Sequence, residues 1–328
     1  MRHLRIGVAG YGAIGRHHAR NLATLPDIDF FGVADPDPLA RSEASASGFE
    51  TYDTLDALLA AGADGIVLSV PTSLHYEFAM RGLEAGCALL IEKPIAMTSL
   101  EGREIIERAK SANTPLMVGY VERYNPAVVA LRDFMQGGDL GKIYGISARR
   151  LGTMPARIKD ANVLIDIGVH DIDMAAFVLD SELELRSAQG GKAVLNDRVD
   201  FAFLALEGRG VPIHIESNWI TPVKFREVLV TGGNGLCHVD YVTQTARFAA
   251  AREFAAVNTF EGIIEQYRTG EFVELPVEKE EPLRRELRTF LAGIRGATLP
   301  DPAVALISLR IAEEATRLIE EQNRTMGE

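Results

Sequence analysis

Three glycines near the start of the chain constrain its fold more than any other feature. Gly10, Gly12 and Gly15 form the pattern G-x-G-x-x-G between an apolar run at 4–9 and an amphipathic stretch. This pattern is typical of the turn between the first strand and the first helix of a dinucleotide-binding βαβ unit. The simpler alternative is a glycine turn that only joins a strand to a helix.

An acidic residue follows at the distance that such a unit requires. Asp35 ends a second apolar run, about 20 residues beyond the last glycine. Its carboxylate is expected to accept hydrogen bonds from the adenosine ribose and to disfavour the 2′-phosphate of NADP. The sequence therefore predicts NAD as the cofactor, although Arg41 offers a partner for a 2′-phosphate. The predicted cofactor-binding residues of this region are Gly10, Gly12, Ala13, Ile14, Gly15 and Asp35.

The patterning of the chain predicts two domains. Over residues 1–122, strands with continuous apolar runs alternate with helices, which indicates a doubly wound parallel sheet of the α/β class. Over residues 123–328, apolar and polar residues alternate on both sides of the turns at 207–210 and 232–235. Consecutive hairpins predict an α+β domain with a large, mainly antiparallel sheet. A sheet face left open there favours a homodimer or homotetramer.

Composition excludes several classes of protein. The formal net charge is −12 and shows no basic stripe, so nucleic acid is not an expected partner. The longest uncharged stretches, such as 65–76, are far shorter than the about 20 apolar residues of a membrane helix. With Cys87 and Cys237 as the two cysteines and no signal-peptide pattern at the start, we expect a cytoplasmic protein without disulfides.

Two motifs carry groups suited to acid–base chemistry. Glu92-Lys93-Pro94 follows an apolar run, which predicts a lysine beyond the carboxyl end of a strand, where ligands of open α/β sheets bind. A surface lysine is the alternative. Asp166 and His170 stand at i and i+4 in a predicted helix over 162–179, and can act as a base and its orienter.

A structural hydrogen bond is the alternative for the pair formed by Asp166 and His170. The other six histidines show no paired ligand spacing, so no metal site is expected.

Together these motifs resemble the glucose–fructose oxidoreductase, inositol dehydrogenase and rhizopine-catabolism family. The resemblance rests on the glycine motif, on E-K-P near position 93 and on D-x-G-x-H-D at 166–171, and it spans nearly the whole chain. It implies that Lys93 and His170 lie beside the nicotinamide and the reacting carbinol, with Asp166 binding or orienting. It also implies that a Pro-containing loop and the E-K-P motif contact the cofactor through Pro71, Thr72, His75, Glu92 and Lys93.

Within that family, three stretches are similar to UDP-N-acetylglucosamine 3-dehydrogenases: 116–128, 148–174 and 216–235. This similarity implies oxidation of the C3 hydroxyl of a UDP-sugar, a step before amination in lipopolysaccharide or lipid A biosynthesis. A cluster of basic residues before the predicted helix suits a diphosphate, although a basic surface loop explains it as well: Arg149, Arg150, Arg157 and Lys159. The predicted substrate-binding residues are Arg123, Arg149, Arg157, Lys159, Asp166 and His170.

Two other functions remain open at this point. One is an NAD-dependent dehydrogenase of a free sugar or an inositol. The other is a non-catalytic NAD-sensing regulator of the same fold, against which Lys93, Asp166 and His170 argue, because a sensor needs no proton acceptor.

Overall fold

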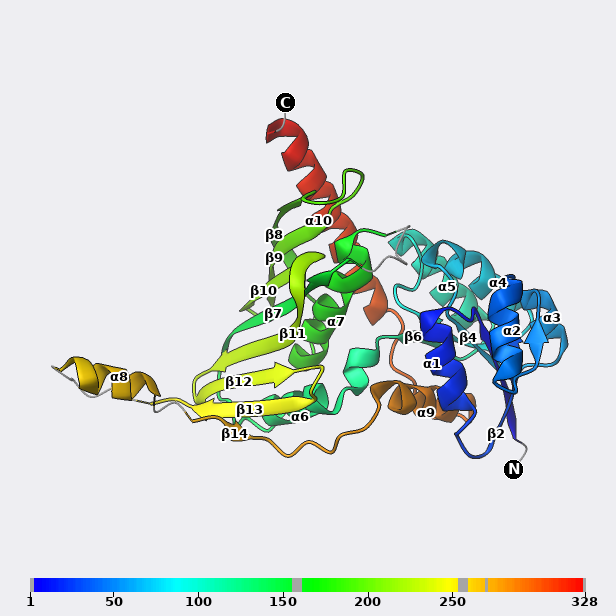
Figure 1. Ribbon diagram of the computed structural model, residues 1–328, viewed down its shortest axis with the longest axis horizontal. Coiled ribbons are helices and arrows are strands. Elements are labelled where there is room, and N and C mark those ends of the chain that lie inside the picture. Colours follow the sequence, from blue (N-terminus) through cyan, green and yellow to red (C-terminus); the bar gives the residue numbers. More distant parts are fainter. Residues whose placement is uncertain (1–2, 155–160, 253–258, 269–270, 327–328) are drawn as a thin grey trace. The chain divides into compact units, whose positions relative to one another are not determined.

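The computed structural model describes residues 3–154, 161–252, 259–268 and 271–326. The chain forms two compact units, one made of residues 1–124 and 281–310 and the other of 125–280 and 311–328. The elements of the first unit, coloured blue to cyan in Figure 1 except for the orange α9, are β1 (Leu4–Ala9), α1 (Ala13–Leu22), β2 (Ile28–Ala34), α2 (Pro38–Ala46), β3 (Thr51–Tyr52), α3 (Leu55–Ala60), β4 (Gly65–Leu68), the 3₁₀ turn η1 (Thr72–Leu74), α4 (His75–Glu84), β5 (Ala88–Glu92), α5 (Ser99–Ser111), β6 (Leu116–Gly119), the 3₁₀ turn η2 (Val121–Tyr124) and α9 (Pro282–Ile294).

The first unit is built on a six-stranded parallel sheet. Its strand order is β3-β2-β1-β4-β5-β6, and every neighbouring pair is parallel. The order reverses between β1 and β4, which is the switch point beyond which ligands of doubly wound sheets bind. The predicted doubly wound α/β domain is confirmed.

A helix from late in the chain completes the core of this unit. Leu287, Phe290 and Leu291 of α9 lie in the same buried cluster as Ile6 of β1 and Leu90 of β5. A single boundary near residue 122 therefore does not describe the division of the chain, because the apolar face of α9 packs into the first unit. Sequence periodicity shows that α9 is amphipathic but not which sheet its face covers.

The second unit is an eight-stranded mixed sheet with helices, in the order β14-β13-β12-β11-β7-β10-β9-β8. Helix α10 begins within the first unit and ends within the second. The elements are α6 (Pro126–Gln136), β7 (Ile143–Thr153), the π-helical turn η3 (Leu164–Gly168), α7 (Val169–Leu179), β8 (Glu184–Gly191), β9 (Phe201–Gly208), β10 (Val211–Asn218), β11 (Ile220–Gly232), β12 (Gly235–Asp240), β13 (Thr245–Ala250), α8 (Phe260–Arg268), β14 (Val273–Glu274) and α10 (Val304–Met326).

The two predicted hairpins are present. β9 pairs antiparallel with β10 across the turn at 209–210, and β11 pairs antiparallel with β12 across 233–234. Only β7 and β10 pair in parallel among the described strands of this sheet. The predicted α+β domain with a mainly antiparallel sheet is confirmed. Among the described residues, no helix combines the length and the apolar character needed to cross a bilayer.

The two faces of the second sheet differ in burial, and two adjacent arginines of β7 show this difference. Helices α6 and α7 lie along one face (Figure 1), and there the buried guanidinium of Arg150 donates to both carboxylate oxygens of Asp171 at 2.9 and 3.0 Å. Successive side chains of a strand point to opposite faces. Arg149 accordingly pairs on the other face, 3.0 Å from Glu216 and 3.6 Å from Glu227.

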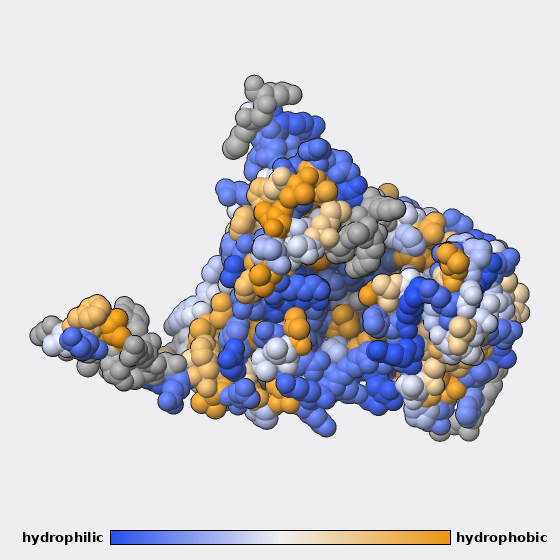
Figure 2. Space-filling view, viewed as in Figure 1, coloured by the Kyte–Doolittle hydropathy of each residue, from blue (hydrophilic) through white to orange (hydrophobic). Residues whose placement is uncertain are grey.

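This other face carries half-exposed rings beside its charges. Phe203 stacks on His214, and the guanidinium of Arg149 lies over the ring of Phe225. In the view of Figure 2, hydrophobic residues are interspersed with hydrophilic ones over the strands of this unit.

The two arginines provide a matched test of these faces. Arg150→Ala leaves the buried Asp171 carboxylate without its guanidinium, and we expect it to lower the free energy of unfolding by about 3–5 kcal/mol. Arg149→Ala removes a solvent-screened pair and should cost about 1 kcal/mol or less. Urea unfolding of both variants measures the difference, and equal losses would contradict the assignment of the faces.

Candidate active site

The glycine motif forms the turn from β1 to α1, and two of its glycines are required by the protein itself. Gly10 has φ +92°, and a Cβ there would lie 2.6 Å from the carbonyl oxygen of Ser69. A Cβ on Gly15 would lie 1.9 Å from the carbonyl oxygen of Gly10. These contacts exclude every other residue at both positions and hold the start of α1 close to β1.

Gly12 is a glycine that the protein alone does not require. Its φ is −70°, which any residue adopts, and a Cβ there would meet no described atom within 4 Å. No side chain caps α1, and Ala13 and Ile14 are exposed, so the first N–H groups of the helix face open space. Backbone N–H groups at a bare helix N-terminus suit a phosphate, and a methyl group on Gly12 would block its close approach. The residues present therefore fit the pyrophosphate of a dinucleotide.

Asp35 lies just beyond the end of β2, next to this turn. Its Oδ2 accepts a hydrogen bond of 2.7 Å from the N–H of Tyr11, and its Oδ1 accepts one of 2.9 Å from Asp37. A carboxylate has about four acceptor positions, so capacity for ribose hydroxyls remains. Arg41 donates to the carbonyl oxygens of Asp35 and Pro36, at 2.7 and 2.9 Å. Arg41 is thus tied to the backbone beside the carboxylate.

The loop that follows β4 carries Pro71, Thr72 and His75. Pro71 and Thr72 begin the turn η1, whereas the ring of His75 is almost completely buried. Its Nδ1 lies 2.8 Å from the carbonyl oxygen of Pro94, and its Nε2 lies 3.0 Å from that of Val70. Burial lowers the pKa of His75 below its ordinary value, against the opposing effect of the two carbonyl groups. His75 therefore joins two loops of the site through its ring.

The E-K-P motif stands at the carboxyl end of β5, as predicted. Glu92 points into the protein, where its Oε1 accepts a hydrogen bond of 2.7 Å from Nε2 of the buried His18. Lys93 is half-buried, its N–H donates to Oε2 of Glu92 at 3.3 Å, and the bond to Pro94 is cis. His18 is a residue of this site that sequence reasoning missed. Its place three residues after Gly15, on the same face of α1, is the signal that was available.

In the second unit, Asp166 lies in the π-helical turn η3, and His170 lies in the first turn of α7, which follows it. The predicted helical segment over 162–179 is present, but residues 164–168 form the wider π-helical turn η3, and α7 begins at Val169. Asn162 caps this turn, accepting from the N–H groups of Leu164 and Ile165 at 3.0 Å each, and donates to Thr316 of α10. π-Helical turns are frequent at functional sites. Asp166 is buried and His170 is half-buried.

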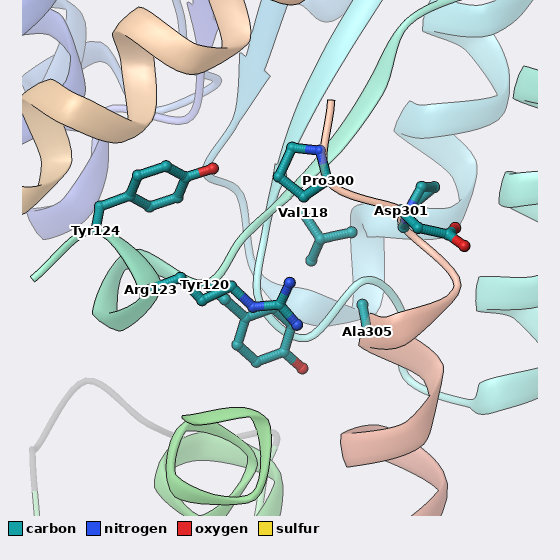
Figure 3. A pocket seen from close by; sticks show the side chains of 8 residues that line it. Val118, Tyr120, Arg123, Tyr124, Pro300, Asp301 and Ala305 are labelled. Atoms are coloured by element: carbon teal, nitrogen blue, oxygen red, sulfur yellow. The ribbon is translucent and has the colours of Figure 1, made fainter. Parts of the chain in front are cut away.

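The predicted basic residues do not form one group. Arg149 lies on the face of the sheet opposite α7, so the structure does not bring it together with His170. Arg157 and Lys159 lie outside the described residues. Arg123 belongs to the first unit, where its guanidinium lies over the ring of Tyr120. Together with Val118, Tyr124 and Asp301 these two line a small pocket (Figure 3).

These features define a class of protein. A doubly wound sheet with an open glycine turn and a carboxylate beside it is typical of a dinucleotide-binding domain, here joined to an α+β unit that carries a carboxylate and a histidine on one helical segment.

Comparison with known proteins identifies the family. Residues 4–120 match the family described as oxidoreductase family, NAD-binding Rossmann fold, and residues 128–237 match the GFO/IDH/MocA C-terminal domain. The two matches cover more than half of the chain, and the chain belongs to the GFO/IDH/MocA family. Its first unit is an NAD-binding Rossmann domain, which confirms the prediction of NAD as the cofactor.

Curated relatives of the chain act on several substrates. The chain is 32% identical to UDP-N-acetylglucosamine 3-dehydrogenase of Acidithiobacillus ferrooxidans over 62% of each chain. It is 30% identical to scyllo-inositol 2-dehydrogenase (NAD(+)) of Bacillus subtilis, over 59% of this chain and 58% of the relative. It is also 29% identical to the rhizopine catabolism protein MocA of Rhizobium meliloti, over 56% of this chain and 59% of that one. In these alignments, the chain spans about three fifths of the length of its relatives.

A solved structure confirms the fold of both units. The structure of UDP-N-acetylglucosamine 3-dehydrogenase from Acidithiobacillus ferrooxidans matches with a TM-score of 0.83. It is 24% identical and the match covers 98% of this chain and 99% of that chain, so the likeness extends through both units.

The glycine turn generates a prediction with an internal control. Gly12→Ala should weaken NAD binding about tenfold or more, because the methyl group displaces the pyrophosphate from N–H donors worth about 1.5–3 kcal/mol each. The same change should barely alter thermal unfolding without NAD. Gly15→Ala should instead destabilise the protein itself, because its Cβ clashes with the backbone of Gly10. Calorimetric titration with NAD and thermal unfolding separate the two effects. Unchanged NAD affinity in Gly12→Ala would contradict pyrophosphate binding at the N-terminus of α1.

Proposed function

We propose that this protein is an NAD-dependent dehydrogenase that oxidises a sugar carbinol, with the C3 hydroxyl of UDP-N-acetylglucosamine as its substrate. The observation that carries the reaction class is the position of Lys93. It lies at the carboxyl end of β5, beyond the same sheet edge as the glycine turn at Gly12 and Asp35. An ammonium group there can hold an oxygen that becomes negatively charged as a carbinol is oxidised.

In the proposed reaction, the carbinol loses a hydride and a proton and becomes a ketone. Bound NAD supplies the hydride acceptor. His170 takes the hydroxyl proton as general base, and Lys93 hydrogen-bonds the same oxygen and stabilises its developing negative charge. Asp166 orients the imidazole or a neighbouring hydroxyl of the substrate. The reverse assignment, with Lys93 as the base, is the alternative that the pH profile below decides.

The sugar nucleotide is supported by the names of relatives. A UDP-N-acetylglucosamine 3-dehydrogenase is 32% identical to the chain. Of the basic cluster proposed to bind the diphosphate, Arg157 and Lys159 remain. Arg149 is paired with Glu216 and Glu227 away from α7, and Arg150 is paired with Asp171. That pairing of Arg149 favours the second candidate, oxidation of a free sugar or inositol, which needs no diphosphate clamp. Two inositol dehydrogenases, at 30% and 32% identity, are further relatives.

We also propose that the open face of the second sheet binds a second copy of the chain in a homodimer or homotetramer. The half-exposed Phe203 and Phe225 lie there among paired charges, and covering them would remove apolar surface from water. A monomeric mass by light scattering at micromolar concentration would exclude this.

A substrate panel tests the proposed function. The enzyme is incubated with NAD and, separately, with UDP-N-acetylglucosamine, other UDP-sugars, glucose and inositols, and NADH absorbance and product mass are followed. We expect NADH together with a product lighter by two hydrogens from UDP-N-acetylglucosamine, and protection against thermal unfolding by UDP alone. Oxidation of inositol or a free sugar without protection by UDP would replace the sugar nucleotide by the second candidate.

Replacement of the proposed base generates a kinetic prediction. His170→Ala should lower kcat by about 10²–10⁴, the usual contribution of a positioned general base, and should leave NAD affinity nearly unchanged. The rise of kcat/KM with pH near neutrality should disappear in this variant. His3→Ala, which removes an exposed histidine before β1, at the sheet edge opposite Lys93, is the matched control and should keep both. A His170→Ala enzyme that retains the rise, with kcat within a fewfold of wild type, would assign the base to Lys93.

A further inference from the structure

Three titratable side chains meet inside the first unit, beneath the strand end that carries Lys93. They are His18 of α1, Glu92 of β5 and Glu286 of α9, and one nitrogen or oxygen of each lies within 4.8 Å of the others. His18 and Glu286 are fully buried. His18 donates to Glu92, and the carboxylate of Glu92 also accepts from the N–H of Lys93. Glu286 has no role in the reaction proposed above.

Glu286 is the unusual member of this group. Both of its carboxylate oxygens are buried, and neither has a hydrogen-bond partner within the described parts of the chain. Its neighbours Leu287 and Phe290 bury the same helix face in the core, so Glu286 cannot reach solvent while α9 stays packed. An isolated ionised carboxylate in such a place is very costly, and the group avoids the cost by keeping its proton.

The neighbouring charges favour the same outcome. Burial and the charge of Glu92 hold the pKa of Glu286 well above its ordinary value. Burial acts to raise the pKa of Glu92 as well, but the hydrogen bond and charge of His18 and the charge of Lys93 outweigh it and lower that pKa. Two carboxyl groups this close ionise one at a time. One anion at Glu92 and one acid at Glu286 is therefore the charge state that these neighbours favour.

We propose that Glu286 is a positioning residue that stays a neutral carboxylic acid and gives its O–H to the carboxylate of Glu92. Glu92 is then held by His18 from one side and by Glu286 from the other, which fixes the end of β5 from which Lys93 extends. The effect of this positioning on catalysis rests on the proposed function of Lys93. The protonation of Glu286 is independent of that function.

Other charged groups near Glu286 and Glu92 must be considered in any pH experiment. His75 acts on Glu92 through its charge, as Lys93 does. Helix α9 also packs against α1, whose Arg20 pairs with Glu281, and against η2, which carries Glu122 and Arg123. A comparison with a variant at residue 286 alone cancels the contributions that these groups make to both proteins.

The test measures unfolding as a function of pH in the cofactor-free protein and in Glu286→Gln, whose amide is neutral at every pH and can donate to Glu92. The unfolded wild-type chain releases the proton of residue 286 at about pH 4.3, while the folded protein retains it. Wild type should therefore lose stability against the variant as pH rises above that value, by about tenfold in the unfolding constant per pH unit until the folded-state pKa is reached. Glu107→Gln, at an exposed position of α5, is the control and should show no such trend.

Two results would overturn the protonated state. One is a stability difference between wild type and Glu286→Gln that stays constant as pH rises, or that shifts in favour of wild type as pH rises. Both outcomes would mean that Glu286 is ionised in the folded protein. The other is stabilisation of wild type, but not of Glu286→Gln, by Zn²⁺ or Mn²⁺. This would mean that a cation, and not a proton, joins the three side chains.

Catalysis tests the positioning role separately. Glu286→Met keeps the side-chain volume but removes the hydrogen-bond donor to Glu92. It should lower kcat severalfold with little change in KM for NAD, whereas Glu286→Gln, which keeps a donor, should have a kcat close to that of wild type. Equal kcat values in the two variants would refute positioning. If none of the candidate substrates is oxidised, the proposed function fails, but the pH dependence of unfolding still decides the state of Glu286.

Discussion

The close approach of α1 to the end of β1 is the constraint on which the rest of the first unit depends. It exists because Gly15 has no side chain, since a Cβ there would lie 1.9 Å from the carbonyl oxygen of Gly10. The contact aims the first N–H groups of α1 at the open space beside Gly12. It also brings His18, one turn further along the helix, within 2.7 Å of Glu92 on β5. The absence of a side chain at Gly15 thereby positions both the N-terminus of α1 and the strand end that carries Lys93.

Features that lie within one short stretch of sequence are the ones that could be predicted. The glycine turn, Asp35 after β2 and Lys93 after β5 each depend on a strand and its next few residues, and the structure has them where the pattern indicates. The hairpins of the second unit follow from alternation around glycine turns in the same way. Local propensity and burial agree at these places, so the pattern alone suffices.

Features that depend on distant packing could not be predicted. The charge pattern of 149–150 reads as one basic cluster, but neighbouring residues of a strand face opposite sides, and Arg149 and Arg150 pair with different acids on different faces. Glu286 lies far along the chain from Glu92, and the sequence of α9 does not indicate that its apolar face packs into the core of the first unit. The π-helical turn before α7 likewise depends on Asn162 and its contact with α10.

Two buried histidines of this unit hold the residues on either side of Lys93. Glu92, before the lysine, is bonded to His18, and the carbonyl group of Pro94, after it, is bonded to His75. The second ring nitrogen of His75 reaches Val70 in the loop after β4. The side chain of Glu92 and the backbone of Pro94 therefore bond to α1 and to α4, the helices that follow β1 and β4 at the switch point. The point from which the lysine side chain extends is fixed in this way, and its ammonium group can be directed at an oxygen that becomes negatively charged.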